Sequence, residues 1–272
     1  AFIWFADYHS FLPVLFFKLA GKNSYVVIGG YDVANIPELN YGSLSKPLRK
    51  KMTLFSLKNA SFCLPVVESL EMRIQEICNE ARIRTIYTGY KVHHNTDNLI
   101  SQKREKIVLT VSVVDSWQRI QIKGLDRFRE LAEKMPDFTF LIIGVNENAK
   151  SYFYPLPANL ILLPPMEISE ITTFYLKASF YTQLSRSEGL PNALCESMLY
   201  GCIPVGTKVG GIPTAIGDTG FILKEWNVHE AMDYISSQHN QINRFLIKNR
   251  IVSIFDLDKR IHKLKQLFDV TE

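Results

Sequence analysis

The feature that most constrains the fold is the alternation of short apolar runs with amphipathic segments of helical length along the 272 residues. The apolar runs show little internal alternation, as expected of strands covered on both faces of a sheet. Strands that alternate with helices predict a parallel, doubly wound α/β sheet. We expect strands at residues 2–5, 25–28, 61–66, 85–87, 107–113, 138–143, 160–163, 180–184, 203–206 and 220–223, and helices at 12–20, 48–59, 70–78, 124–134, 169–177, 191–200 and from 228 onward.

Two series of strands and helices are separated by a polar segment without a clear period, residues 92–106, which we interpret as a linker. Chains of this length are normally built from two domains. Near the end of the chain, Leu257, Ile261 and Leu264 follow the spacing of one helix face. The expected parts are a first domain over residues 1–92, a second over 93–255 and a terminal helix over 256–272.

Composition narrows the classes of protein that fit. The net charge of +4 suits phosphorylated ligands or an anionic membrane surface, but it is too small to indicate nucleic-acid binding. The four cysteines form no Cys-x-x-Cys pair and have no histidine at ligand spacing, so neither a zinc site nor a disulfide framework is indicated. The most apolar early run, 11–19, is interrupted by Pro13 and Lys18 and is too short to span a bilayer. No signal peptide precedes that run, so we expect a cytoplasmic protein.

The strongest signal for a functional site lies in residues 185–220. Two carboxylates, Glu188 and Glu196, stand there with seven residues between them, across the expected start of a helix. One of them can face sugar hydroxyls while the other reaches a ribose, so the spacing predicts a sugar-nucleotide site. The plain alternative is an acid that favours the helix dipole and a second acid on a solvated helix face.

The residues around these acids define the ends of that helix. Pro191 fits the first turn, where a proline removes no hydrogen bond, and Gly201 can adopt the left-handed conformation that ends a helix. The amides around Gly189, Leu190 and Asn192 then lie at the positive end of the helix. An anionic group such as a phosphate is favoured at this position.

Residues 185–220 resemble the Glu-x7-Glu signature of the retaining glycosyltransferases of family 4, which have the GT-B fold. The match covers both acids, the Glu-Gly-Leu-Pro-Asn segment, the Gly-Cys-Ile-Pro-Val strand start, the Gly-Gly-Ile-Pro loop and the Gly-Asp-Thr-Gly turn, and weaker similarity extends over almost the entire chain. The resemblance implies two Rossmann-like domains that face a cleft, with a terminal helix that returns to the first. Because the chain opens at Ala1 in a strand and lacks the glycine-rich acceptor-side loop of the family, we interpret the first domain as N-terminally truncated.

The same resemblance implies transfer of a sugar from a nucleotide diphosphate donor to a glycan or lipid-linked acceptor, with retention of configuration and without a metal or other cofactor. Polysaccharide biosynthesis and peripheral contact with the inner face of a membrane are further expectations. No dinucleotide-binding Gly-x-Gly-x-x-Gly motif and no Walker loop occurs, which argues against a dehydrogenase or a kinase. Two alternatives stay open: a truncated remnant that binds nucleotide or nucleotide sugar without turnover, and a GT-B sugar-nucleotide epimerase.

Roles for individual residues also follow from the resemblance. Glu188 would contact the donor sugar hydroxyls, and Glu196 the ribose of the nucleotide. Lys123, in a Lys-Gly pair at the expected start of a helix, would hold the donor diphosphate. The arginine that normally assists it is absent from its usual place, where this chain has Ser-Val-Val at 112–114, and Arg119 is the candidate replacement. The alternative for Lys123 and Arg119 is an ordinary surface role.

The remaining candidates stand at the expected ends of strands. Gly210 and Gly211 would let the backbone approach the sugar and phosphates, and Gly144 would lie beside the base, although the second glycine of the family's Gly-x-Gly is missing. His9 would reach the donor sugar and Asp32 would lie on the acceptor side. The competing interpretations are a plain turn for the glycines and a structural role for the histidine.

Overall fold

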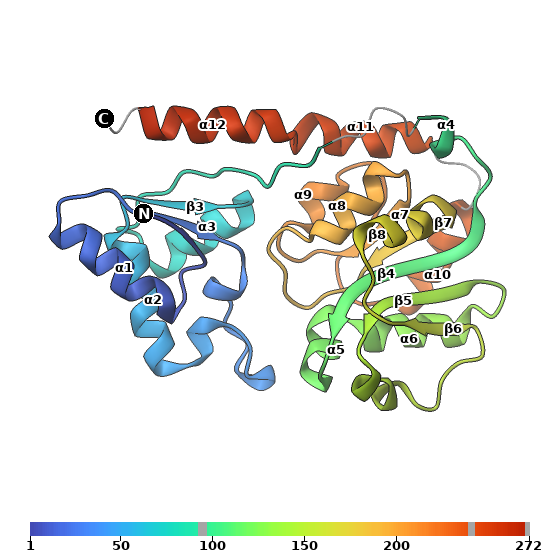
Figure 1. Cartoon of the computed structure of the whole chain (residues 1–272). Helices are drawn as coiled ribbons and strands as arrows, with labels where there is room; N and C mark the ends of the chain where they lie inside the picture. Colours follow the sequence, from blue (N-terminus) through green and yellow to red (C-terminus); the bar gives the residue numbers. More distant parts are fainter. Residues whose placement is uncertain (92–96, 239–242, 270–272) are drawn as a thin grey trace. The chain divides into compact units, whose positions relative to one another are not determined.

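The computed structural model describes residues 1–91, 97–238 and 243–269 (Figure 1). The chain divides into two compact units, each built on its own parallel sheet. The predicted domain boundary between residues 92 and 93 lies outside the described residues. The first unit comprises Ala1–Gly89, Ser187–Leu190 and Phe255–Glu272, and the second comprises Tyr90–Arg186 and Pro191–Ile254.

The sheet of the first unit has three parallel strands in the order β1-β2-β3. Every residue of the central strand β2 is buried, because neighbours flank it on both edges and helices cover it. Helices α1 and α2 pack against each other, with the rings of Phe11 and Phe55 4.8 Å apart. The elements are β1 (Phe2–Trp4), α1 (Tyr8–Leu19), β2 (Tyr25–Ile28), α2 (Pro47–Asn59), β3 (Phe62–Pro65) and α3 (Glu68–Ile77), with 3-10 turns at Tyr31–Val33, Pro37–Leu39 and Ser43–Ser45.

The predicted strand at residues 85–87 is wrong. The Ile86 N–H donates to the Pro65 carbonyl at 3.0 Å, so the chain runs beside β3 here, but no ladder is formed. Two carbonyls of this segment are bound by a side chain, because the Arg260 guanidinium donates to the carbonyls of Ile86, at 3.1 Å, and Tyr87. An arginine side chain thus takes acceptors that strand pairing would otherwise use.

Arg260 belongs to α12 (Leu257–Asp269), which groups with the first unit. The ring of Phe268 meets that of Tyr25 edge to face at 5.1 Å, and Leu267 is buried. The apolar face of α12 therefore packs against the sheet at the amino-terminal end of β2.

The sheet of the second unit has six parallel strands in the order β6-β5-β4-β7-β8-β9. The chain runs outward from β4 to β6 and then returns to β7 on the other side of β4. The strand order therefore reverses between β4 and β7, which is where sheets of this kind bind ligands at the carboxyl ends of their strands. The strands are β4 (Glu105–Val114), β5 (Thr139–Val145), β6 (Leu160–Leu163), β7 (Ala178–Gln183), β8 (Ile203–Thr207) and β9 (Phe221–Leu223).

The helices of the second unit form two packed groups (Figure 1): α6 contacts α10, whereas α8 contacts α9 and α11. The chain reverses its direction along the sheet after β6. Because crossover connections are right-handed, the helices before and after this reversal lie on opposite faces of the sheet. The helices are α4 (Asp97–Ile100), α5 (Trp117–Lys123), α6 (Leu125–Lys134), α7 (Ile168–Lys177), α8 (Asn192–Leu199), α9 (Ile212–Ile216), α10 (Val228–Gln238) and α11 (Arg244–Ile254), with a 3-10 segment at Glu147–Phe153.

Helix α5 departs from the expectations, and so does the linker. Residues 92–96 of the predicted linker lie outside the described residues, but the rest contains α4 and the start of β4. Lys123 is the last residue of α5 and does not open a helix, because Gly124 adopts the left-handed conformation, with φ of 66°, between α5 and α6. Arg119 lies in the same helix.

The described part of the chain contains no helix that is both long and apolar enough to cross a bilayer. All four cysteines are free thiols, and Cys63, Cys195 and Cys202 are buried. Burial raises the pKa of the Cys195 thiol, on α8, to about 12, so this group is protonated at neutral pH.

Candidate functional site

A cavity of about 310 Å³ lies at the carboxyl ends of β4 and β7 in the second unit. This is the point at which the strand order reverses. Three segments supply most of its lining: the end of β4, helix α5 and the start of α8. The last residue of β7 completes it. The lining residues are Val111, Ser112, Val113, Arg119, Lys123, Gln183, Pro191, Asn192 and Ala193.

Two cations face this cavity from α5. Arg119 and Lys123 are four residues apart, which places them one above the other on the same helix face. The helix begins at Trp117, because the Ser116 side chain accepts the Arg119 N–H at 3.3 Å. The Arg119 guanidinium makes no hydrogen bond or ion pair with another described residue. The cavity therefore has a positive wall with capacity to bind an anion.

The helix α5 ends where a glycine is required. Gly124 has a positive φ, and a Cβ atom at this position would lie 1.9 Å from the Leu184 carbonyl oxygen. The turn between α5 and α6 therefore packs directly on the backbone that follows β7. This packing fixes the position of Lys123 relative to the end of that strand.

The opposite wall of the cavity is the first turn of α8. Pro191 stands at the N-cap and supplies no side-chain acceptor to the first amides of the helix. Asn192 and Ala193, the first two helical residues, line the cavity. The positive end of the helix dipole thus adds to the charge of the two cations on α5.

The floor of the cavity is a fixed polar side chain. Gln183, at the end of β7, is 4% exposed. Its amide nitrogen donates to the Ser185 hydroxyl at 2.8 Å, and its amide oxygen accepts from the Tyr181 hydroxyl at 3.3 Å. Because both ends of the amide are bonded, the orientation of Gln183 is set by the protein.

Glu196 lies one turn further along α8 than Asn192, on the same helix face. Its side chain is half-buried, and burial raises the pKa of the carboxyl above its usual value of 4.5. Glu188, Gly189 and Leu190 are in the loop before α8 and group with the first unit.

The predicted glycines have structural positions. Gly144 lies in β5 with φ of 105°, and a Cβ there would come 2.3 Å from the Ser112 carbonyl oxygen. This close approach accommodates the irregular pairing of β4 with β5 between Val111 and Val114. Gly210 and Gly211 directly precede the short helix α9. The ligand contacts expected of all three glycines stay predictions.

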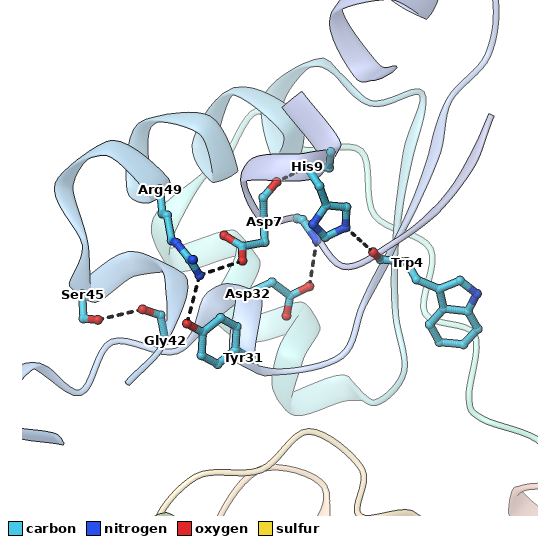
Figure 2. A network of polar contacts seen from close by, with 10 residues as sticks. Trp4, Asp7, His9, Tyr31, Asp32, Gly42, Ser45 and Arg49 are labelled. Carbon is cyan, nitrogen blue, oxygen red and sulfur yellow. Dashed lines mark hydrogen bonds and ion pairs between the residues drawn. The ribbon is translucent and has the colours of Figure 1, made fainter. Parts of the chain in front are cut away.

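In the first unit, Asp32 and His9 belong to a polar cluster at the carboxyl ends of β1 and β2 (Figure 2). Asp32 has no exposed surface, and its two oxygens accept the N–H groups of Ala6 (3.1 Å), Gly29 (3.3 Å) and Gly30 (2.8 Å). Burial raises the pKa of its carboxyl. Asp32 thus holds the backbone of two strand ends together, and its acceptor-side role stays a prediction.

His9 is exposed on the first turn of α1, one turn past the strand end where the sequence places it. Its Nε2 atom is 2.8 Å from the Trp4 carbonyl oxygen. The cluster also contains an ion pair that sequence reasoning misses, between Arg49 and Asp7 at 3.1 Å (Figure 2). The Arg49 side chain also donates to the Tyr31 hydroxyl at 3.3 Å.

The cavity in the second unit thus brings together Arg119, Lys123, Pro191 and Asn192 from the predicted set. Sequence reasoning misses Val111, Val113 and Gln183, which carry no motif. Within the described residues, no group of three His, Cys, Asp or Glu side chains is placed to hold a metal ion.

Comparisons with known proteins agree with this arrangement. A family model described as glycosyl transferases group 1 matches residues 94–245, which is more than half of the chain. The trehalose synthases of Thermococcus litoralis and Pyrococcus furiosus are each 25% identical over 182 residues, covering 60% of this chain and 44% of theirs. The chain thus spans less than half the length of these curated relatives.

Solved structures show the same fold. Sucrose-phosphate synthase from Thermosynechococcus elongatus superposes with a TM-score of 0.79 at 14% identity, covering 98% of this chain and 72% of that one. Anabaena HepE in complex with UDP gives 0.77 at 14% identity, covering 99% and 78%. The two parallel sheets are those of the GT-B fold. Together with the family match, they show that the chain belongs to the group 1 glycosyl transferases.

Proposed function

We propose that this protein transfers a sugar from a nucleotide diphosphate donor to a glycan or lipid-linked acceptor, with retention of configuration, as the family 4 glycosyltransferases do. The observation that carries the proposal is the cavity at the switch point of the second sheet. It combines two cations on one helix face with the N-terminus of another helix. This combination suits a diphosphate, which carries its charge over several oxygen atoms.

The chemistry assigned to these groups is stabilisation of the leaving diphosphate. In the proposed reaction the bond between the anomeric carbon and the phosphate oxygen breaks, and the acceptor hydroxyl attacks from the same face. The proton of that hydroxyl passes to the leaving phosphate. Negative charge grows on the diphosphate as it leaves, so Lys123 and Arg119 stabilise the transition state more than the bound donor. No metal is required for this step.

The proposed donor is a UDP-sugar. Support comes from Anabaena HepE, which has been solved with UDP and with UDP-glucose. We assign the ribose to Glu196 and the sugar hydroxyls to Glu188, which lie on either side of the α8 N-terminus in sequence. An ionised carboxylate accepts two hydroxyl hydrogen bonds and so suits a vicinal diol.

A titration with UDP tests the central assignment. Replacing Lys123 by Ala should weaken UDP binding about tenfold to a hundredfold, the usual range for a lost hydrogen bond to a charged group. The matched control is Lys177→Ala, since Lys177 ends α7 on an exposed surface. Equal affinity of the wild-type protein and the Lys123 variant, measured by calorimetry, would contradict the proposal.

The alternative of nucleotide binding without turnover is favoured by one observation, which is that Ser112, Val113 and Val114 stand where the diphosphate-binding arginine of the family is expected. Release of UDP from UDP-glucose separates the possibilities. A transferase consumes donor faster when an acceptor is added, whereas an epimerase converts it without one and a binding protein leaves it intact.

We propose a cytoplasmic location, with peripheral contact at the inner face of a membrane when the acceptor is lipid-linked. The supporting feature is the mild positive charge of +4. Co-sedimentation with vesicles that contain anionic lipid, compared with neutral vesicles, tests this contact directly.

A further inference from the structure

One arginine outside the cavity joins the two chain segments that carry the proposed donor residues. Arg186 lies two residues before Glu188 in sequence, in the loop after β7. Its guanidinium forms a two-pronged ion pair with Asp126, with distances of 2.7 and 2.6 Å. Asp126 lies in the first turn of α6, three residues after Lys123.

Arg186 also bonds to the last turn of α5. Its backbone N–H donates to the Ile122 carbonyl at 2.8 Å, and its guanidinium donates to the Gln121 carbonyl at 2.6 Å. One residue therefore binds α5 and α6 on both sides of Gly124. The backbone contact of Gly124 with Leu184 lies within the same joint.

We propose that Arg186 and Asp126 are a positioning pair, which sets the distance between Lys123 and the end of β7. This inference rests on the proposed function, because it gives the pair a role in donor binding. Lys123 reaches the diphosphate only when the C-terminal turn of α5 is held in register with the end of β7. The pair itself does not touch the donor.

Stability alone is a poor explanation for this pair. Both side chains are about one-third exposed, at 31% and 32%, and ion pairs in such positions contribute little to the free energy of unfolding. The fork-to-fork geometry of an arginine and a carboxylate does fix direction, since two parallel hydrogen bonds allow only one relative orientation. Displacement of a binding group by about 1 Å can lower an enzyme's rate about a hundredfold.

The test uses two conservative substitutions in the full chain. Arg186→Lys keeps the charge but loses the fork, and Asp126→Asn keeps the shape but loses the charge. Both should lower UDP affinity about tenfold, because the charge-assisted hydrogen bond from Lys123 is then poorly aligned, with the melting temperature nearly unchanged. The matched control is Arg129→Lys, because Arg129 also pairs with a carboxylate, Glu133 at 2.8 Å, and binds the Pro155 carbonyl at 2.7 Å, but does not line the cavity.

A double-mutant cycle separates positioning from a general loss of structure. Once Lys123 is replaced by Ala, Arg186→Lys should have little further effect on UDP affinity, because the residue that it positions is gone. Arg129→Lys should leave UDP affinity unchanged in either background. A full tenfold loss from Arg186→Lys in the Lys123 variant would overturn the positioning role.

The failure of each proposal is recognisable. If Lys123→Ala weakens UDP binding while Arg186→Lys and Asp126→Asn do not, the pair is not a positioning pair and the proposed function stands. If the wild-type protein binds no UDP, the proposed function fails, and the positioning role fails with it. If Arg186→Lys melts at a much lower temperature, Asp126→Asn decides the matter through the same cycle.

Discussion

The polar cluster of the first unit and the cavity of the second differ in how their charged groups are used. Asp32 is fully buried, and its oxygens accept three backbone N–H groups. Arg119 lines a cavity, and its guanidinium has no partner among the described residues. Both positions follow the carboxyl end of a strand. Position at that edge therefore does not by itself identify a ligand-binding group. It is more informative to ask whether the polar atoms of the side chain already have hydrogen-bond partners within the protein.

We expect the largest change in stability at Asp32. Replacing Asp32 by Ala should lower the free energy of unfolding by about 3 kcal/mol, because buried backbone donors lose their acceptor. UDP affinity of the folded fraction should stay within twofold of the wild-type value. Urea denaturation and UDP titration measure the two effects.

The control for Asp32 is Asp258→Ala on the exposed first turn of α12, which should change the free energy of unfolding by less than about 0.5 kcal/mol. A large loss of UDP affinity in the Asp32 variant, without loss of stability, would show that the first unit's cluster acts on the donor.

Arg119 should behave in the opposite way. Arg119→Ala removes a cation that binds nothing within the described chain, so the free energy of unfolding should change by less than about 0.5 kcal/mol. UDP affinity should fall about tenfold, the lower end of the range for one charge-assisted hydrogen bond. Calorimetric titration checks this, and Arg119→Lys should recover part of the affinity. An unchanged affinity would assign the diphosphate to Lys123 and the helix N-terminus alone.

The smallest expected effect is on pH dependence. Because burial raises the pKa of Glu196 above 4.5, this group loses its charge at a higher pH than an exposed glutamate. UDP-glucose affinity should therefore fall about fivefold as the pH drops through the raised pKa, since a neutral acid accepts hydroxyl hydrogen bonds less strongly. Glu196→Gln should bind UDP-glucose with lower affinity at neutral pH and without this dependence.

The same pKa shift has the reverse effect on stability. The folded protein holds the Glu196 proton more tightly than the unfolded chain does. The contribution of this group to the free energy of unfolding therefore falls as the pH rises from the pKa of the unfolded chain through the raised pKa of the folded protein. A fall of UDP-glucose affinity at low pH that is identical in wild type and Glu196→Gln would assign the titration to another group.

Much of the second unit could be predicted from the sequence. Strands β5 and β8 are buried on both faces, so their residues form continuous apolar runs, and the sequence predicts both within two residues of their bounds. Residues 85–87 mislead because their β-favouring composition is local, whereas a strand also needs partners along its length. There the Arg260 side chain, far along the chain, takes the carbonyls.

Part of the candidate site could also be predicted, because some of its residues lie together in one sequence motif. Pro191, Asn192 and Glu196 belong to a motif within one segment, whereas Arg119 and Lys123 face one cavity only because residues 117–123 form a helix. The sequence does contain the signals for that helix, which are Ser116 at its start and Gly124 at its end. The bond between Arg186 and Asp126 joins residues 60 positions apart and leaves no local pattern.

The alkylation rate of the buried Cys195 thiol on α8 can be used to follow local opening of this helix. Cys195 sits on the inner side of the helix whose first turn lines the cavity, and a protonated, enclosed thiol does not react with alkylating reagents. The rate at which Cys195 is labelled therefore measures how often α8 separates from the sheet. The more accessible Cys78 serves as an internal control for the activity of the reagent. A ligand seated against the helix would slow the first rate and leave the second untouched.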